Sequence, residues 1–147
     1  MHVTRRRSAG RPSQPRTDTF TGEVWLDPVQ PTTDGTTIND VFFAPGARTH
    51  WHHHEHGQIL IVLSGSGLVC PDGEQPTSIE SGDVVWVPAG ERHWHGAAPD
   101  SYLLHRAVSL GVTSWAGQVA DQEYRPGVVV SDLSGLPWRQ SPVRAQA

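Results

Sequence analysis

Histidine is concentrated in one short part of this sequence. Five of the nine histidines fall between His50 and His56, and His93 and His95 form a second group further along the chain. Neutral imidazole binds Mn, Fe, Co, Ni, Cu and Zn, and imidazole is also a frequent acid or base in enzymes. The clustering therefore indicates a metal centre, with proton transfer as a second function of the same side chains.

The alternation of side chains along extended backbone selects the residues that can share one ion. Because successive side chains of a strand point to opposite faces, His52 and His54 share a face and His53 points away from them. Gln58 follows a short turn and can return an amide oxygen to the same side. One or two coordination positions would stay open for water or substrate, as a catalytic site requires. The predicted metal ligands are His52, His54, Gln58 and His93.

Two further histidines are candidates for proton transfer. His95 shares a face with His93 and is either a fourth nitrogen ligand or a base beside the metal. With four ligands already assigned, the base is the favoured role. His105 is in parity with Leu103 and Ala107 and so faces inward, where a polar group needs a partner that His95 or a substrate can supply. We therefore predict that His95 and His105 are the catalytic residues.

The residues around these positions have simpler interpretations. His53 and His56 are predicted to face solvent or to support the ligands, and parity points Glu55 away from the predicted ligand pair. His50 is equally compatible with a pocket wall and with an exposed position.

Three residues on other strands have the parity of inward-facing side chains. The predicted substrate pocket therefore includes Asn39, Val41 and Ser109.

Short β-strands are the elements that must position these side chains. Runs rich in Val, Ile, Thr and Trp are separated by turns, and the chain contains 15 Gly and 12 Pro. About nine short strands at regular spacing predict an all-β sandwich or barrel. Pro28 and Pro31 are expected to end the first long strand, and residues 114–124 are the one place where a short helix is expected.

The length of the chain predicts its domain organisation. A chain of 147 residues is expected to form one domain, which we place at residues 19–125, between an N-terminal tail (1–18) and a C-terminal tail (126–147) that we expect to be disordered or loose. In the C-terminal tail only residues 128–130 have a pattern that could pair with a sheet.

Charge, apolar runs and cysteine content restrict the possible partners and location. The formal charge is −4 without a basic patch, which excludes nucleic acid as the expected partner, and no apolar run reaches the roughly 20 residues of a membrane span. The single cysteine, Cys70, excludes an internal disulfide and agrees with a cytoplasmic location.

Two patterns bracketed by glycines resemble the motifs of the cupin superfamily. The first is matched by Gly46, His52, His54, Gln58 and Gly65, and the second by Gly82, Pro88, Gly90 and His93. The resemblance covers roughly residues 19–125. It implies a single cupin barrel, a double-stranded β-helix of jelly-roll type, with the metal on the four ligands predicted above. The third ligand of the motif is usually Glu, so Gln58 indicates a subgroup.

More narrowly, the chain is similar to the small bacterial cupins that include the manganese-dependent hydroxynitrile lyases. The matching segments are residues 20–22, 45–49, 51–52, 57–58, 82–86 and 93–99, together with Tyr124. The similarity implies a homodimer or homotetramer that binds Mn(II) in the first place and Fe(II) in the second. It also implies a small-molecule substrate, a cyanohydrin that is cleaved reversibly to a carbonyl compound and cyanide.

Two other functions fit the same residues. An open Mn or Fe site can serve a cupin dioxygenase that cleaves a carbon–carbon bond oxidatively. The absence of a Glu ligand makes this function less favoured than the lyase. A non-catalytic cupin that binds metal or a small molecule is the other possibility. The two enzymes would depend strongly on His95, whereas the binding protein would depend on it little.

Overall fold

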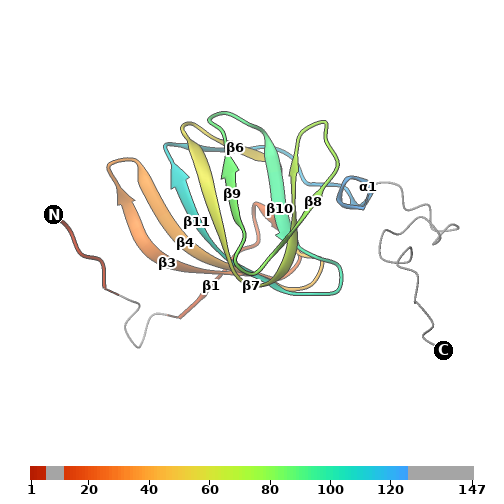
Figure 1. The fold of residues 1–147 in the computed structure, drawn as a ribbon, viewed down its shortest axis with the longest axis horizontal. Coiled ribbons are helices and arrows are strands. Elements are labelled where there is room, and N and C mark those ends of the chain that lie inside the picture. Colours follow the sequence, from red (N-terminus) through yellow and green to blue (C-terminus); the bar gives the residue numbers. More distant parts are fainter. Residues whose placement is uncertain (6–11, 126–147) are drawn as a thin grey trace, which may run out of the picture.

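The strands of this protein curl into a half-barrel (Figure 1). The computed structural model describes residues 1–5 and 12–125, so the predicted C-terminal tail and its residues 128–130 lie outside the described residues. Within the described residues the strands are β1 (Gln14–Pro15), β2 (Phe20–Thr21), β3 (Val24–Thr33), β4 (Thr36–Phe43), β5 (Arg48–Thr49), β6 (His52–His54), β7 (Gly57–Pro71), β8 (Thr77–Glu80), β9 (Val84–Val87), β10 (His93–Ala97), β11 (Leu103–Leu110) and β12 (Thr113–Trp115), and the helix is α1 (Asp121–Tyr124).

Strand β7 connects the two layers of the half-barrel. Its first half pairs with β11 and β9, and its second half pairs with β10 and β8. Two glycines lie between the halves. A Cβ atom on Gly65 would lie 2.0 Å from the carbonyl oxygen of Tyr102, and one on Gly67 would lie 2.3 Å from the carbonyl oxygen of Gly96. The bare backbone at these positions therefore lets one strand pass from one layer to the other.

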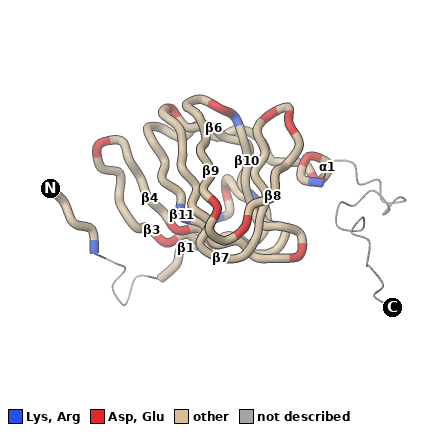
Figure 2. The backbone as a smooth tube through the Cα atoms, in the orientation of Figure 1, with Lys and Arg blue, Asp and Glu red and all other residues tan. Residues whose placement is uncertain are grey.

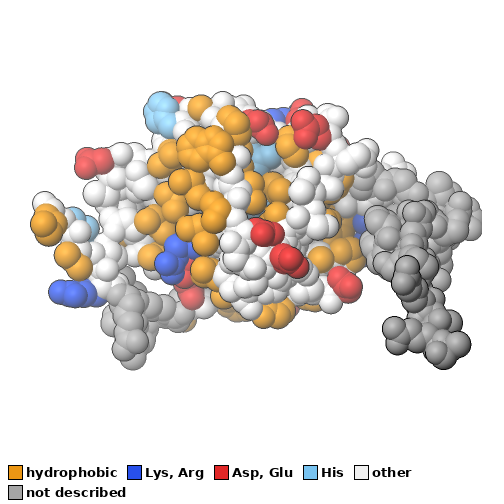
Figure 3. Space-filling view, viewed as in Figure 1, with side chains coloured by type: hydrophobic (Ala, Val, Ile, Leu, Met, Phe, Trp, Pro, Cys, Tyr) orange, Lys and Arg blue, Asp and Glu red, His pale blue; other side chains and the backbone are white. Residues whose placement is uncertain are grey.

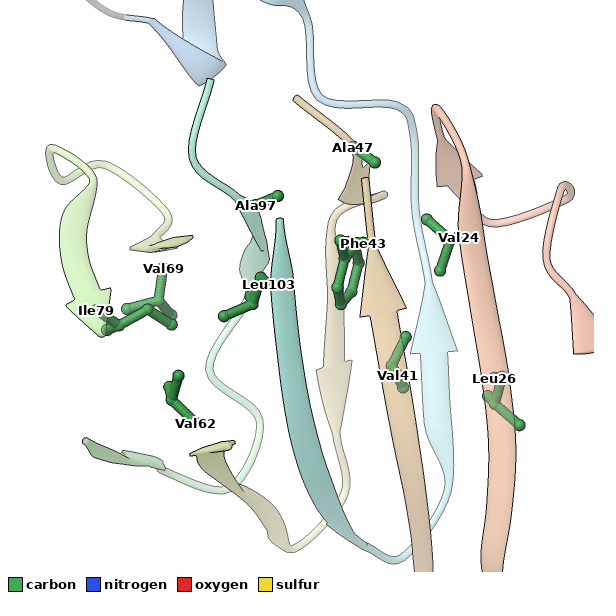
Figure 4. Close-up of a cluster of buried hydrophobic side chains, with 10 residues drawn as sticks. All are labelled: Val24, Leu26, Val41, Phe43, Ala47, Val62, Val69, Ile79, Ala97 and Leu103. Carbon is green, nitrogen blue, oxygen red and sulfur yellow. The ribbon is translucent and has the colours of Figure 1, made fainter. Parts of the chain in front are cut away.

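The core lies inside the curl. Alternate residues of β3, β4, β7, β10 and β11 point inward and form an apolar cluster in which Phe43, Ala97 and Leu103 are completely buried (Figure 4). A second cluster holds the end of the domain in place. There Tyr124 donates a hydrogen bond of 2.6 Å to the carbonyl oxygen of Ala97 and packs against Trp94. Alternate residues of β11 are thus buried, as alternation predicts, whereas all five residues of β10 are buried.

Strand β3 is longer than the sequence predicts. Pro28 and Pro31 were expected to end it, yet the strand continues to Thr33 with register shifts around Gln30. β1 pairs with β3 only at Leu26 and Trp25, so in the described part of the chain the outer edge of β3 has no pairing strand at either proline. Proline is tolerated at such an edge because no neighbouring strand needs its missing N–H group.

The two ends of the described domain also differ from the prediction. β1 lies within residues 1–18, which were predicted to be a disordered tail, and the amide of Arg16 donates a 2.9 Å hydrogen bond to the carbonyl oxygen of Val24. Residues 113–115 form strand β12 on the edge of β6, and only Asp121–Tyr124 of the expected helical region is helical. In both places a free strand edge recruits a segment whose own sequence carries little pattern.

No helix among the described residues is long and apolar enough to span a membrane.

We predict that Gly96→Ala destabilises the fold by about 2–3 kcal/mol. The new Cβ atom would lie 2.4 Å from the carbonyl oxygen of Ala47 and 2.6 Å from the Cα atom of Arg48, which are backbone atoms held in the sheet. The matched control is Gly117→Ala, because nothing lies within 4 Å of a Cβ atom there. Urea denaturation of both variants measures the difference, and equal free energies of unfolding would contradict the prediction.

Candidate metal centre

A cavity of about 250 Å³ lies on the inner side of the half-barrel. Inward-facing residues of β4, β6, β7, β10 and β11 line it, so side chains that are far apart in the sequence converge on one space. The residues predicted for the substrate pocket all contribute to its wall: Asn39, Val41 and Ser109. The wall also includes most of the predicted ligands and bases: His52, His54, Gln58, His95 and His105. The role of each of these side chains stays a prediction.

The imidazole rings pack around His52. Its ring centroid lies 4.3 Å from that of His93, 5.0 Å from that of His54 and 5.1 Å from that of His95. All four rings are buried. Nitrogen atoms of His52, His93 and His95 lie within 4.8 Å of one another, a spacing at which three histidines can hold one metal ion. This group of three includes His95, a predicted base, and leaves out His54, a predicted ligand.

Backbone carbonyl groups determine which nitrogens are available. Nδ1 of His52 lies 2.9 Å from the carbonyl oxygen of His50, and Nδ1 of His93 lies 2.9 Å from that of Glu91. A carbonyl oxygen only accepts, so Nδ1 carries the proton in both rings. Burial lowers the pKa of both imidazoles, so they are neutral at pH 7 and Nε2 carries a lone pair. This is the tautomer of a histidine that ligates metal through Nε2.

Gln58 presents its amide oxygen to the same point. Its amide nitrogen donates a 3.1 Å hydrogen bond to Oγ of Ser109, which orients the amide group. Its Oε1 atom lies 3.2 Å from Nε2 of His93. Nε2 of neutral His93 has no proton to donate. A lone pair of this nitrogen therefore faces a lone pair of Oε1 of Gln58. Such an arrangement fits a cation bound between nitrogen and oxygen donors.

Other polar atoms of the cluster are buried without hydrogen bonds. Within residues 1–5 and 12–125, Nε2 of His54, Nε2 of His95 and Nδ1 of His105 have no hydrogen-bond partner. The other nitrogen of His54 lies 2.9 Å from Oγ1 of Thr113. Buried polar atoms are rarely left without a partner, so these three nitrogens are further places where a metal ion or a substrate fits.

His95 and His105 form a directly bonded pair. Nε2 of His105 lies 2.9 Å from Nδ1 of His95, so one ring donates and the other accepts. Burial, reinforced by the neighbouring His105, lowers the pKa of His95 well below its usual value. Burial also lowers the pKa of His105 to about 4. Both rings are therefore neutral at pH 7 and can accept a proton from a bound group.

The structure also shows site residues that the sequence did not reveal. Trp115 lines the cavity, and its ring centroid lies 4.6 Å from that of His52. Phe20 lines the cavity as well and packs against Trp115 at 5.6 Å. Trp115 was missed because its segment was expected to be helical. Strand parity within residues 113–115 would have paired it with Thr113, which faces the same cavity.

The remaining residues of the histidine cluster lie outside the centre. The His56 side chain is 67% exposed, and Glu55 is exposed and accepts a hydrogen bond from the amide of Val112. His50 and His53 are half-buried. The exposure of Glu55 agrees with its parity, and that of His56 agrees with its predicted solvent-facing position. His50 contributes its backbone carbonyl group to the site.

Comparisons with known proteins identify the family. A family model described as a cupin domain matches residues 39–104. An (R)-mandelonitrile lyase from Granulicella tundricola is 42% identical over 114 residues, which cover 74% of this chain and 87% of that protein. A cupin-like protein from Thermotoga maritima has a crystal structure with a TM-score of 0.70 and 44% identity, covering 75% of this chain and 88% of that one. This chain belongs to the cupin family.

More distant solved structures share the fold alone. A polyketide cyclase from Streptomyces resistomycificus matches with a TM-score of 0.66 at 17% identity, over 84% of this chain and 91% of the cyclase. The family and the all-β barrel fold predicted from the two glycine-bracketed motifs are thus confirmed. The metal and the reaction are separate questions, because one cupin fold supports many chemistries.

We predict that the metal-free cupin loses stability as the pH falls below 7. The buried imidazoles have lowered pKa values in the folded chain, so the unfolded chain, with ordinary values near 6.5, binds more protons below that pH. His105 alone, with a folded pKa of about 4, would reduce the free energy of unfolding by about 2 kcal/mol between pH 7 and pH 5. Urea denaturation at these two pH values measures the loss.

The control for this prediction is His56→Gln. This substitution removes an exposed histidine and should leave the pH dependence unchanged. His105→Leu should make the free energy of unfolding depend less steeply on pH. An equal stability of the metal-free chain at pH 7 and pH 5 would contradict the prediction.

Proposed function

We propose that this cupin is a metal-dependent hydroxynitrile lyase that cleaves an aryl cyanohydrin to an aldehyde and hydrogen cyanide. The observation that carries the proposal is the convergence of a possible metal centre and a bonded imidazole pair in one cavity. The relative from Granulicella tundricola, named as an (R)-mandelonitrile lyase, supports the choice of reaction. That relative is matched over 87% of its length, so the shared part includes nearly all of it.

The proposed cofactor is a divalent metal ion, Mn(II) first and Fe(II) second. Its proposed ligands are His52, His54, Gln58 and His93. These four side chains are uncharged at pH 7, so none of them would neutralise the ion. When bound, such an ion supplies Lewis-acid polarisation of the substrate's hydroxyl or carbonyl oxygen.

The proposed base is His95, with His105 behind it. Nδ1 of His95 is occupied by His105, which leaves Nε2 of His95 for the substrate. In the cleavage direction the hydroxyl proton passes to this nitrogen. The bond between the carbinol carbon and the nitrile carbon then breaks, and its electron pair leaves with cyanide. Cyanide takes up the proton as hydrogen cyanide, and the aldehyde remains.

The aromatic side of the cavity fits an aryl group. Phe20, Phe43 and Trp115 line it, and the Phe20 ring lies 6.1 Å from Phe43 and 5.6 Å from Trp115. Aromatic rings pack favourably at these separations, so a phenyl substituent can join the cluster. Asn39 and Ser109 also line the cavity and provide polar groups. We infer that these residues select aromatic over small aliphatic cyanohydrins.

We predict that the purified cupin, reconstituted with Mn(II), holds about one ion per chain. His52→Ala should lose the ion, because it removes a nitrogen from the middle of the cluster. His56→Ala is the matched control and should keep it, because His56 is exposed. Elemental analysis after dialysis measures the content. A loss of metal in His95→Gln would show that His95 is a ligand, and the role of base would then pass to His105.

We predict that the metal-loaded cupin releases benzaldehyde from (R)-mandelonitrile in mildly acidic solution. His95→Gln should reduce kcat by about 100-fold or more while keeping the metal, because a positioned base contributes a factor of that order. His56→Gln should keep full activity. The absorbance of benzaldehyde follows the reaction, with an oxygen electrode in parallel. Oxygen uptake with a diketone and no cleavage of mandelonitrile would instead support a dioxygenase.

A further inference from the structure

One permanently charged side chain lines the cavity. The described wall consists of apolar residues, hydroxyl groups, amide groups and imidazoles, and it contains no Asp, Glu or Lys. The exception is Arg16, whose guanidinium group keeps its charge throughout the pH range of a folded protein. In the described domain, the charged positions lie mostly at the turns between strands (Figure 2). The cavity is thus a weakly charged space with one fixed positive group on its wall.

Strand pairing turns Arg16 toward the inside of the half-barrel. Gln14 of β1 lies opposite Leu26 of β3. Two residues further along, the amide of Arg16 donates a 2.9 Å hydrogen bond to the carbonyl oxygen of Val24. Side chains that lie opposite each other in an antiparallel pair point to the same face. Val24 and Leu26 are buried in the inner core, so Arg16 lies on the inner side of the sheet with them.

The backbone that follows Arg16 is held in place as well. The carbonyl oxygen of Thr19 accepts a 2.8 Å hydrogen bond from the amide of His50. Phe20 is paired with Thr49, which joins β2 to β5. The side chains of Thr19 and Phe20 also line the cavity. One anchored segment therefore supplies both a positive charge and an aromatic ring to the cavity wall.

The guanidinium group of Arg16 has no partner among the described residues. Within residues 1–5 and 12–125 it forms no ion pair, whereas Arg48 pairs with Asp121 and Arg106 with Asp40, each at 2.8 Å. Arg16 is exposed, so it lies where the cavity opens to solvent. A guanidinium group offers two parallel N–H donors to a carboxylate. An unpaired one on a cavity wall fits the carboxylate of a bound molecule.

We propose that Arg16 recognises a carboxylate, and that the substrate is an aryl cyanohydrin that carries a carboxylate on its ring. This substrate class rests on the lyase function proposed above. The ring would pack against Phe20 and Trp115, which line the same cavity and lie 5.6 Å apart. The carboxylate would receive charge-assisted hydrogen bonds from Arg16, which are about twice as strong as hydrogen bonds between neutral groups.

The reacting part of the substrate does not supply the anion. The cyanohydrin and the aldehyde are neutral, and hydrogen cyanide is a weak acid that stays protonated in mildly acidic solution. The negative group that suits Arg16 therefore belongs to a part of the substrate that does not react. On the outer face drawn in Figure 3, hydrophobic side chains gather over β11, β7 and β9 and basic side chains are few. A carboxylate therefore meets few competing cations on that face.

The test is the binding of 4-carboxybenzaldehyde, the aldehyde that such a substrate would release, to the full Mn(II)-loaded chain. Its methyl ester has the same ring and aldehyde without the charge, and isothermal titration calorimetry measures both affinities. We expect the acid to bind about five- to tenfold more tightly than the ester, because Arg16 is exposed to solvent. Arg16→Gln should remove this preference, and Arg16→Lys should keep part of it.

The matched control is Arg5→Gln, because Arg5 is exposed and does not line the cavity. This variant loses the same charge and should keep the preference. Circular dichroism establishes that each variant is folded, as expected for substitutions at exposed positions. Equal affinities of the wild-type chain for the acid and the ester would overturn the proposal. So would a preference that persists in Arg16→Gln and is lost in His52→Ala, because the carboxylate would then depend on the metal centre.

Binding is measured without turnover, so the two proposals can fail separately. A chain that prefers the acid through Arg16 and leaves every cyanohydrin intact would lose the lyase function and keep the carboxylate site. A chain that cleaves mandelonitrile and binds the acid and the ester equally would keep the lyase function and lose the role of Arg16.

Discussion

Two backbone carbonyl groups decide what the buried histidines can do. Those of His50 and Glu91 hold the Nδ1 protons of His52 and His93, and so leave both Nε2 lone pairs free. Burial keeps the rings uncharged, which removes the repulsion that five protonated imidazoles would suffer. Without these two conditions the cluster would be a destabilising group of polar side chains. With them it is a set of neutral donors around one point.

Strand β7 determines where these neutral donors converge. Its first half carries Gln58 and pairs with β11, the strand of His105 and Ser109. Its second half pairs with β10, the strand of His93 and His95. One continuous strand thus connects both groups of side chains, and the glycines between its halves let neighbouring backbone approach closely. The cavity and the core therefore depend on the same backbone path.

The proposed chemistry follows from the uncharged character of the site. A metal ion held by neutral ligands keeps its charge for the substrate oxygen, and a bonded imidazole pair beside it can take up the hydroxyl proton. The outward residues of the same strands are largely apolar, so the sheet carries the site on its inner face and an apolar surface on its outer face.

The sequence alone determined the family, the all-β fold and the inward direction of the site residues, because strand parity and motif spacing are local properties. It could not predict Trp115 as a cavity residue, because β12 exists only through the edge of β6. Nor could it predict the passage of β3 through two prolines, and it left open whether His95 or a substrate is the partner of His105. These features depend on which strands become neighbours, and only the tertiary structure decides that.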